Sequence, residues 1–191
     1  MSKEIKIGNF LFKETKIKDV YEITPVIFGD NRGYFMETYK KAVFDQAGLI
    51  YDFVQDNESK SKKGVLRGLH FQKEFPQAKL VRCLEGEVFD VCVDLRKNSE
   101  TYGQYVGVIL SAEKGNQLMI PRGFAHGFLV LSETTTFFYK CDELYHKEDE
   151  CGIKWNDPDI GIIWPNIEEI LLSEKDQKQP SLKEAKVEFD L

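Results

Sequence analysis

Cysteine and histidine are both scarce in this sequence, and their spacing limits the metal chemistry open to it. The 191 residues include four cysteines and three histidines. Cys83, Cys92, Cys141 and Cys151 form no C-x-x-C pair, so they predict neither a zinc site nor a small disulfide framework. Cys83 and Cys92 lie inside apolar runs, which is typical of small core residues. This cysteine usage favours a reducing compartment, the cytoplasm.

Long hydrophobic runs and an excess of positive charge are also missing. No apolar segment approaches membrane-spanning length, and the opening MSKEIKIGNF lacks the apolar core of a secretory signal. The formal net charge is −6, whereas general nucleic-acid binding needs a basic face. We therefore expect a cytoplasmic protein that binds neither membrane nor nucleic acid. Cations focused in one pocket can still bind a phosphate-bearing small molecule.

The sequence does contain a long succession of short β-type segments. From residue 64 to 140, runs rich in β-branched and aromatic residues alternate with turn signals, which favours a β-sandwich or barrel over a parallel α/β sheet. The segment 79–96 predicts two strands joined at Glu85-Gly86, with one apolar face formed by Phe89, Val91, Val93 and Leu95. No linker divides the chain, so a single domain over residues 1–191 is expected.

Other segments give weaker signals. Residues 37–48 have the apolar spacing of a helix that Gly48 ends, and residues 166–177 predict a second short helix. Residues 52–64, DFVQDNESKSKKG, predict a strand end and then a polar loop with solvated lysines. The polar tail after residue 177 is expected to pack back on the β-domain.

Residues 64–82, GVLRGLHFQKEFPQAKLVR, hold the side chains most suited to catalysis. Arg67, His70 and Lys79 lie close together in this stretch. One base that can be neutral and two cations suit chemistry on an anionic or carbonyl-bearing substrate. A polar loop between two strands is the alternative interpretation.

The roles of two further residues depend on which face of their predicted strands they occupy. PRGFAHGF predicts a turn and then a strand with an inward His126, similar to the second motif of the cupin barrels. His126 could have a structural role or face a pocket. In TTTFFYK, alternation places Phe137 and Tyr139 on one face. Tyr139 becomes an acid candidate if it faces the same cavity as His70, and Asp176 alone would be taken for a surface acid.

The histidine count argues against a metal site. Metal-binding cupins carry a His-x-His pair in their first motif, and the matching segment here, GLHFQ, has one histidine. A facial metal site needs two histidines and a carboxylate, so we predict no metal and no cofactor.

The whole sequence resembles the dTDP-4-dehydrorhamnose 3,5-epimerases, a metal-free cupin family. The resemblance rests on several segments that occur in the family's order. They are FGDNRGYFMETY, FVQDNESKSKKGVLRGLHFQ, KLVRCLEGEVFDVCVDLR, IPRGFAHGFLVLSE, FFYK, CGIKWNDPDIGIIWP and LSEKD.

The resemblance implies a fold and an activity. It implies a mainly β, cupin-type jelly-roll barrel or sandwich with a few short helices, and a homodimer in which an N-terminal strand region is exchanged. The implied reaction is epimerisation of dTDP-4-dehydro-6-deoxy-D-glucose at C3 and C5, without a cofactor. This step belongs to dTDP-L-rhamnose biosynthesis and so to cell-surface polysaccharide biosynthesis.

The resemblance also implies roles for individual residues. His70 would be the base, Asp176 its orienting partner, Tyr139 the opposing acid and Lys79 the group that stabilises the enolate. Glu37 matches a residue that reaches the neighbouring subunit's site. The implied substrate-binding residues are Phe28, Arg32, Glu37, Gln55, Asn57, Arg67, His126, Tyr145, Glu150 and Lys175.

One departure from the family pattern and several alternatives remain. The family commonly has a proline two residues after the position of Tyr145, where this chain has Lys147, which affects the alignment of Glu150. An epimerase acting at one carbon, or on another nucleotide 4-keto sugar, would use the same acid and base. A metal-dependent cupin oxygenase and a non-catalytic sugar-nucleotide-binding cupin are alternatives from other classes.

Overall fold

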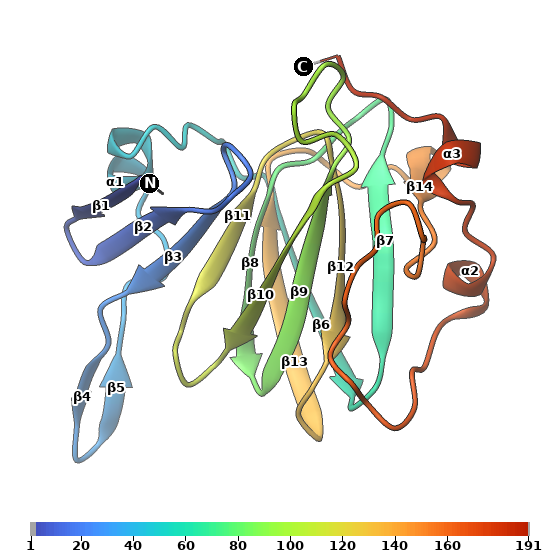
Figure 1. Cartoon of the computed structure of the whole chain (residues 1–191). Helices are drawn as coiled ribbons and strands as arrows, with labels where there is room; N and C mark the ends of the chain where they lie inside the picture. Colours follow the sequence, from blue (N-terminus) through green and yellow to red (C-terminus); the bar gives the residue numbers. More distant parts are fainter. Residues whose placement is uncertain (1–2, 191) are drawn as a thin grey trace.

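Two antiparallel β-sheets packed face to face form the body of the protein (Figure 1). The computed structural model describes residues 3–190. The larger sheet has seven strands in the order β1-β2-β3-β11-β8-β13-β6, and the smaller has five in the order β10-β9-β12-β7-β14. The prediction of a mainly β jelly-roll is confirmed, as a sandwich with open sheet edges.

The strands are short, as the spacing of the turn signals predicted. The larger sheet contains β1 (Glu4–Ile7), β2 (Phe10–Glu14), β3 (Tyr21–Pro25), β11 (Gln117–Ile120), β8 (Lys79–Glu85), β13 (Thr134–Cys141) and β6 (Gln55–Lys62). The smaller sheet contains β10 (Tyr105–Ser111), β9 (Glu87–Asp94), β12 (Phe124–Val130), β7 (Leu66–Gln72) and β14 (Glu150–Gly152). Strands β1–β3 continue the sheet of their own chain, because β3 pairs with β11.

The main core fills the space between the two sheets. Val81 and Phe137 of the larger sheet pack with Val88, Cys92 and Phe128 of the smaller one. Cys83 and Cys92 are both buried, as their apolar surroundings predicted. The inner face of each sheet is therefore largely filled by packed apolar side chains. A site can form only at the end of the interior where the side chains are polar.

The predicted hairpin at residues 79–96 is confirmed. Strand β8 ends at Glu85, β9 begins at Glu87, and Gly86 joins them with a φ of 76°. A side chain at Gly86 would also meet the Thr134 carbonyl oxygen at 2.2 Å, so glycine is required there. Phe89, Val91, Val93 and Leu95 share the outer face and pack against the chain's end at Val187 and Phe189. The tail therefore packs on the β-domain as expected.

The helices are shorter than predicted. Helix α1 covers Lys41–Gln46, not residues 37–48, because Lys40 is extended and caps its start. Phe44 anchors α1 edge-on against Phe10 and Phe12, and Gly48 follows its end with a φ of 87°. Of residues 166–177, only α2 (Glu174–Gln177) is helical; a 3-10 turn (Lys147–Asp149) and α3 (Leu182–Ala185) complete the set. No helix in residues 3–190 is long and apolar enough to span a membrane.

The prediction of a polar loop after residue 54 is wrong. Gln55–Lys62 forms strand β6, which pairs with β13 along its whole length. The period-2 signal was hidden because the inward side chains, Gln55, Asn57, Ser59 and Ser61, are polar instead of apolar. Three of these four line a cavity, so the polar pattern reflects a site and not a loop.

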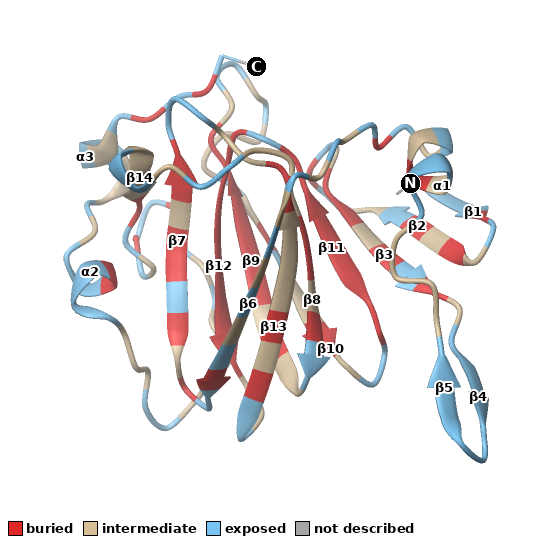
Figure 2. Ribbon diagram, turned by 180° about the vertical axis from the view of Figure 1, so that it is seen from behind, coloured by how far each residue is buried: buried red, intermediate tan, exposed pale blue. Residues whose placement is uncertain are grey.

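A two-stranded hairpin extends from the sandwich. Strands β4 (Phe28–Asp30) and β5 (Gly33–Phe35) pair across the turn that the GDNRG segment predicted. Figure 2 shows every residue of both strands as exposed. Phe28 and Phe35 have exposed fractions of 49% and 66%. Large aromatic rings left in water on a projecting element are typical of a surface that contacts another protein.

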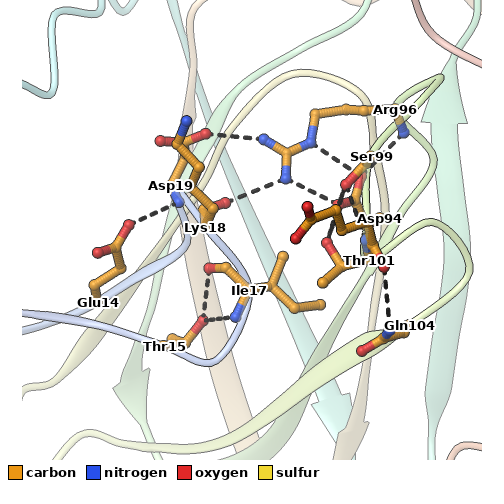
Figure 3. A network of polar contacts seen from close by, with 11 residues as sticks. Glu14, Thr15, Ile17, Lys18, Asp19, Asp94, Arg96, Ser99, Thr101 and Gln104 are labelled. Atoms are coloured by element: carbon orange, nitrogen blue, oxygen red, sulfur yellow. Dashed lines mark hydrogen bonds and ion pairs between the residues drawn. The ribbon is translucent and has the colours of Figure 1, made fainter. Parts of the chain in front are cut away.

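A buried ion-pair network fixes one corner of the sandwich (Figure 3). Asp94 is fully buried and accepts hydrogen bonds from Arg96, Ser99 and Thr101. Arg96 also donates to Asp19 at 2.9 Å, which ties the segment before β3 to the end of β9. Burial alone would raise the pKa of Asp94, but the hydrogen bonds from Arg96 and Thr101 outweigh burial and lower it.

Replacing Asp94 with asparagine is expected to destabilise the protein by about 3 to 5 kcal/mol, because Arg96 loses its buried partner. The folded-state pKa of Asp94 lies below the unfolded one, so its stabilisation is present above the unfolded pKa and lost as pH falls through the folded pKa. Urea unfolding at several pH values should show the gap between wild type and Asp94→Asn closing under acid. A gap that stays constant would contradict the assignment of this stability to the Asp94 carboxylate.

Candidate functional site

A cavity of about 650 Å³ opens at the polar end of the sandwich interior. Strands β6, β7, β8, β12 and β13 form its walls, and the segment before and through α2 closes one side. Its polar lining combines cations, carboxylates, amides and hydroxyls: Gln55, Asn57, Ser59, Lys62, Arg67, His70, Gln77, Lys79, His126, Tyr139, Tyr145, Glu150, Ser173, Lys175 and Asp176.

Two glycines let β7 and β12 approach closely beneath this cavity. A Cβ atom on Gly68 would lie 2.6 Å from the Gly127 Cα, and one on Gly127 would lie 2.6 Å from the Arg67 carbonyl oxygen. The pairing register shifts at this point, and His70 of β7 faces His126 of β12. The glycines in RGLH and AHGF therefore set the spacing of the two pocket histidines.

His70 is paired with a carboxylate from the chain's last segment. Its Nε2 lies 2.6 Å from Asp176 Oδ1, although the two residues are 106 positions apart. Asp176 lies in α2 with an exposed fraction of 3%, and the Ser173 hydroxyl caps its backbone N–H. Burial raises the pKa of Asp176, but the His70 hydrogen bond and charge outweigh it, so the net shift is downward. The ionised carboxylate fixes the ring and leaves Nδ1 for a ligand.

Tyr139 and Lys79 come from adjacent strands of the opposite sheet. Tyr139 shares the inward face of β13 with Phe137, as the alternation predicted. Burial is the main cause that raises the pKa of Tyr139 to about 12, so its hydroxyl stays protonated at neutral pH. The Lys79 Nζ lies 5.9 Å from the Tyr139 ring centroid. Burial lowers the pKa of Lys79, and nearby acidic groups oppose that shift.

Strand β6 and Arg67 line the neighbouring wall. The Arg67 guanidinium donates to the Ser61 hydroxyl through Nε at 3.2 Å and Nη2 at 3.1 Å. Gln55 donates to Asn57 Oδ1 at 3.0 Å and accepts the backbone N–H of Tyr145 at 2.9 Å. This wall presents a planar cation and several amides, the groups that bind phosphate and sugar oxygens.

The loop at residues 141–150 places Tyr145 and Glu150 at the pocket despite the departure at Lys147. Tyr145 Oη donates to Glu150 Oε2 at 2.8 Å, and the Lys175 ammonium donates to the same oxygen. Burial raises the pKa of Glu150, but these two hydrogen bonds outweigh it and lower the pKa overall. Lys147 begins a 3-10 turn, and Asp149 accepts backbone N–H groups from Glu74 and Phe75. That anchor holds the loop that contains Lys147.

The cavity contains all the side chains singled out from the sequence except Phe28, Arg32 and Glu37. Arg32 lies at the hairpin tip, where its side chain is 85% exposed and pairs with Asp30. Glu37 accepts a hydrogen bond from Asn9 at 2.7 Å. A single chain does not bring these residues to its own cavity, so their substrate-binding role stays a prediction that requires a second chain.

Sequence reasoning missed several lining residues. Ser59, Lys62, Gln77 and Ser173 also border the cavity. The period of two that carries Gln55 and Asn57 inward would have pointed to Ser59, had β6 been recognised as a strand. Ser173 precedes Asp176 by the spacing of a helix N-cap, a signal that LSEKD contains.

The arrangement can perform proton transfer. It sets a carboxylate-paired imidazole, a protonated phenol and a buried ammonium around one space, with further cations at the rim. Within residues 3–190, no group of three or more His, Cys, Asp or Glu side chains is placed to hold a metal ion.

Comparison with known proteins connects this pocket to one family. The family model for dTDP-4-dehydrorhamnose 3,5-epimerase matches residues 14–184. The chain is 54% identical to the dTDP-4-dehydrorhamnose 3,5-epimerase of Methanothermobacter thermautotrophicus, covering 93% of this chain and 97% of the relative. It is 52% identical to the Escherichia coli protein of the same name, covering 89% of this chain and 93% of that one.

Solved structures agree with the sequence comparisons. The dTDP-6-deoxy-D-glucose-3,5-epimerase of Legionella pneumophila, in complex with dTDP-4-keto-L-rhamnose, superposes with a TM-score of 0.89 at 48% identity. The match covers 91% of this chain and 93% of the Legionella chain. The family match over residues 14–184 includes all the segments that form the cavity.

Proposed function

The chain belongs to the dTDP-4-dehydrorhamnose 3,5-epimerase family, and on that basis we propose how its pocket converts dTDP-4-dehydro-6-deoxy-D-glucose to dTDP-4-dehydro-L-rhamnose. The reaction inverts C3 and C5 of the sugar and is a step in dTDP-L-rhamnose biosynthesis. The observation that carries the mechanism is the His70–Asp176 pair, with Tyr139 and Lys79 in the same cavity.

The substrate's ketone explains why these groups are needed. A carbonyl at C4 acidifies the C–H bonds at both C3 and C5, because either carbanion is delocalised as an enolate. Inversion requires that a proton leave one face of the ring and that another arrive on the opposite face. A base, an acid across the ring and a cation near the carbonyl oxygen together meet these requirements.

His70 would remove the proton through Nδ1, since Nε2 is held by Asp176. The carboxylate keeps the proton of the neutral ring on Nε2 and stabilises the imidazolium that forms once Nδ1 has accepted a proton. Asp176 is 3% exposed, so water competes little for this hydrogen bond. The pair is therefore suited to a base that must recover between two proton transfers.

Tyr139 would return a proton on the far face, and Lys79 would stabilise the enolate oxygen. With a pKa of about 12, the Tyr139 hydroxyl is fully protonated at neutral pH and is ready to donate. The Lys79 ammonium lies on β8, beside Tyr139, where burial strengthens its interaction with a developing negative charge. An oxyanion-stabilising donor typically contributes about 10²- to 10³-fold to the rate.

The nucleotide would occupy the wider rim. Arg67 can bind two diphosphate oxygens through its planar fork, and Tyr145, 49% exposed at the rim, offers a ring for the thymine base. The remaining proposed contacts to the dTDP-sugar come from the polar side chains of the wall and rim: Gln55, Asn57, His126, Glu150 and Lys175.

We propose further that the protein works in the cytoplasm as a homodimer whose β4–β5 hairpins complete each other's cavities. Phe28 and Arg32 are exposed on a projecting element, away from their own chain's pocket. Such a hairpin could add an aromatic ring and a cation to the partner's rim. The exchange of a longer N-terminal region stays a prediction, since β3 pairs with β11 of the same chain.

The exchange of hairpins gives a prediction for mixed dimers. Arg32→Ala should lower kcat/KM by about 10- to 100-fold, the loss expected for a charged hydrogen bond worth roughly 1.5 to 3 kcal/mol. Mixing this variant with His70→Gln under subunit exchange should restore activity, because one site then has an intact base and an intact hairpin. Light scattering should give twice the 22.1 kDa chain mass. Mixed dimers no more active than either parent would contradict the exchange.

The proposed function is tested by the product. Purified protein mixed with dTDP-4-dehydro-6-deoxy-D-glucose should change the ring proton couplings in ¹H NMR to those expected for inversion at both C3 and C5. Inversion at C3 or C5 alone would identify a single-position epimerase. An unchanged sugar with a folded, dTDP-binding protein would indicate a non-catalytic binder.

A further inference from the structure

A second histidine–aspartate pair lies beside the first on the pocket floor. His126 of β12 is directly opposite His70 of β7 in the strand register. The Nε2 atom of His126 lies 2.9 Å from Oδ2 of Asp90. His126 borders the cavity with an exposed fraction of 8%, whereas Asp90 on β9 is fully buried behind it. Asp90 therefore cannot touch a ligand directly but can act through His126.

The contacts of Asp90 are too few for it to be a stabilising group. It occupies the inward face of β9 between Val88 and Cys92, two residues of the main core. Its Oδ1 has no hydrogen-bond partner among the described residues, and His126 is the side chain that contacts its Oδ2. A buried carboxylate with a single partner costs stability compared with an apolar residue. Retaining one beside a pocket is typical of a functional requirement.

The contact defines the chemical state of the His126 ring. If the Asp90 carboxylate is ionised it can only accept a hydrogen bond, and Nε2 of His126 is then the protonated donor of the 2.9 Å contact. The Phe137 ring lies nearly parallel to the imidazole, at 6.2 Å between centroids and 19° between planes. With Nε2 engaged and the ring packed, Nδ1 is the nitrogen left for a bound sugar.

We propose that Asp90 is a positioning residue for the epimerisation: it holds His126 with Nε2 protonated, so that Nδ1 contacts the sugar between His70 and Lys79. This inference rests on the proposed function. The charge of Asp90 also reaches Lys79, where it opposes the lowering of the Lys79 pKa by burial. Removing Asp90 should therefore weaken catalysis at the sugar end of the cavity and leave nucleotide binding at the rim intact.

Strand β9 supplies a matched pair of variants. Asp90 and Asp94 are both fully buried on β9, but Asp94 lies in the structural network and outside the cavity. Asp90→Asn should lower kcat by about 10- to 100-fold while the Kd for dTDP and the melting temperature change little. Asp94→Asn should lower the melting temperature and leave kcat unchanged at a temperature where it is folded. Equal kcat for Asp90→Asn and wild type, or a kcat loss only where Asp90→Asn is unfolded, would overturn the proposal.

Imidazole ¹⁵N NMR reports the tautomer directly, because the chain has three histidines and His146→Gln removes the one outside the pocket. In the wild type, His126 should show a protonated Nε2. In Asp90→Asn, the Nε2 and Nδ1 shifts of His126 should change and those of His70 should not. A wild-type His126 protonated at Nδ1 alone would overturn the proposal without any variant.

A double-mutant cycle tests whether Asp90 acts through His126. If it does, Asp90→Asn combined with His126→Gln should reduce kcat no further than His126→Gln alone. Full additivity of the two losses would overturn the proposal. Failure here is distinct from failure of the proposed function, because the latter requires that the wild type itself not convert the substrate.

Discussion

Replacing His70 with glutamine is expected to lower kcat by about 10²- to 10⁴-fold, the range for loss of a general base. Glutamine can still hydrogen-bond to Asp176, so the segment that carries α2 should remain in place. Both inversions use the same base, so exchange at C3 and at C5 should fall together. Solvent-deuterium uptake into the substrate, followed by NMR, measures both positions in one experiment.

His146→Gln is the matched control for that variant. His146 stacks on Phe75 at 4.0 Å between ring centroids and lies outside the cavity, so its loss should leave kcat unchanged. The Kd for dTDP and the melting temperature of His70→Gln should stay near the wild-type values. If His70→Gln retained more than about a tenth of wild-type exchange, a loss smaller than the range for a general base, His70 would not be the base.

Tyr139→Phe should separate proton removal from inversion. The substitution deletes one hydroxyl and keeps the ring that packs against Phe137. His70 can still remove a proton and return a deuteron to the same face, so the recovered substrate should gain deuterium. Product formation should fall by about 10²- to 10⁴-fold, because the acid on the opposite face is missing.

The raised pKa of Tyr139 also predicts the shape of the pH–rate profile. With a pKa of about 12, Tyr139 remains protonated across the neutral and moderately alkaline range, so its ionisation adds no falling limb to the wild-type rate below about pH 11. If Tyr139→Phe removed a falling limb at neutral or moderately alkaline pH, the hydroxyl would ionise well below pH 12, which would contradict the raised pKa of Tyr139. Equal loss of exchange and of inversion in Tyr139→Phe would show that the hydroxyl is needed for proton removal itself.

The sequence predicted those parts of the fold in which burial is apolar. Strands β8 and β9 are rich in apolar, buried residues on either side of Gly86, and the structure places the hairpin there. Strand β6 was predicted as a loop because its inward residues line the cavity and are polar. The start of helix α1 was predicted four residues too early, since Tyr39 matches the helical spacing but contacts Phe44 from a position before the extended N-cap residue Lys40.

The residues of the candidate site also divide into those that the local sequence indicated and those that it did not. Arg67, His70 and Lys79 lie within one short stretch, so local chemistry alone indicated them. Asp176 lies 106 residues from His70, and only the resemblance to a family pointed to it before its 2.6 Å contact was visible. Asp90 was hidden because alternation drew attention to the opposite, apolar face of β9.

For three predicted substrate-binding residues, the structure of one chain does not explain the predicted role. Phe28, Arg32 and Glu37 lie away from the pocket of their own chain, so no fold of one chain explains a substrate-binding role for them. The partner chain proposed above would account for the exposure of Phe28 and Arg32, and the sequence of one chain does not describe that contact.

Deuterium incorporation in D₂O tests cofactor-free proton transfer most directly. The wild-type protein, treated with a chelator and mixed with dTDP-4-dehydro-6-deoxy-D-glucose, should place solvent deuterium at both C3 and C5 of the product, as seen by NMR. Label at C3 or C5 alone would show a single-position epimerase. Product without label, or activity lost to the chelator, would contradict proton exchange through His70 and Tyr139.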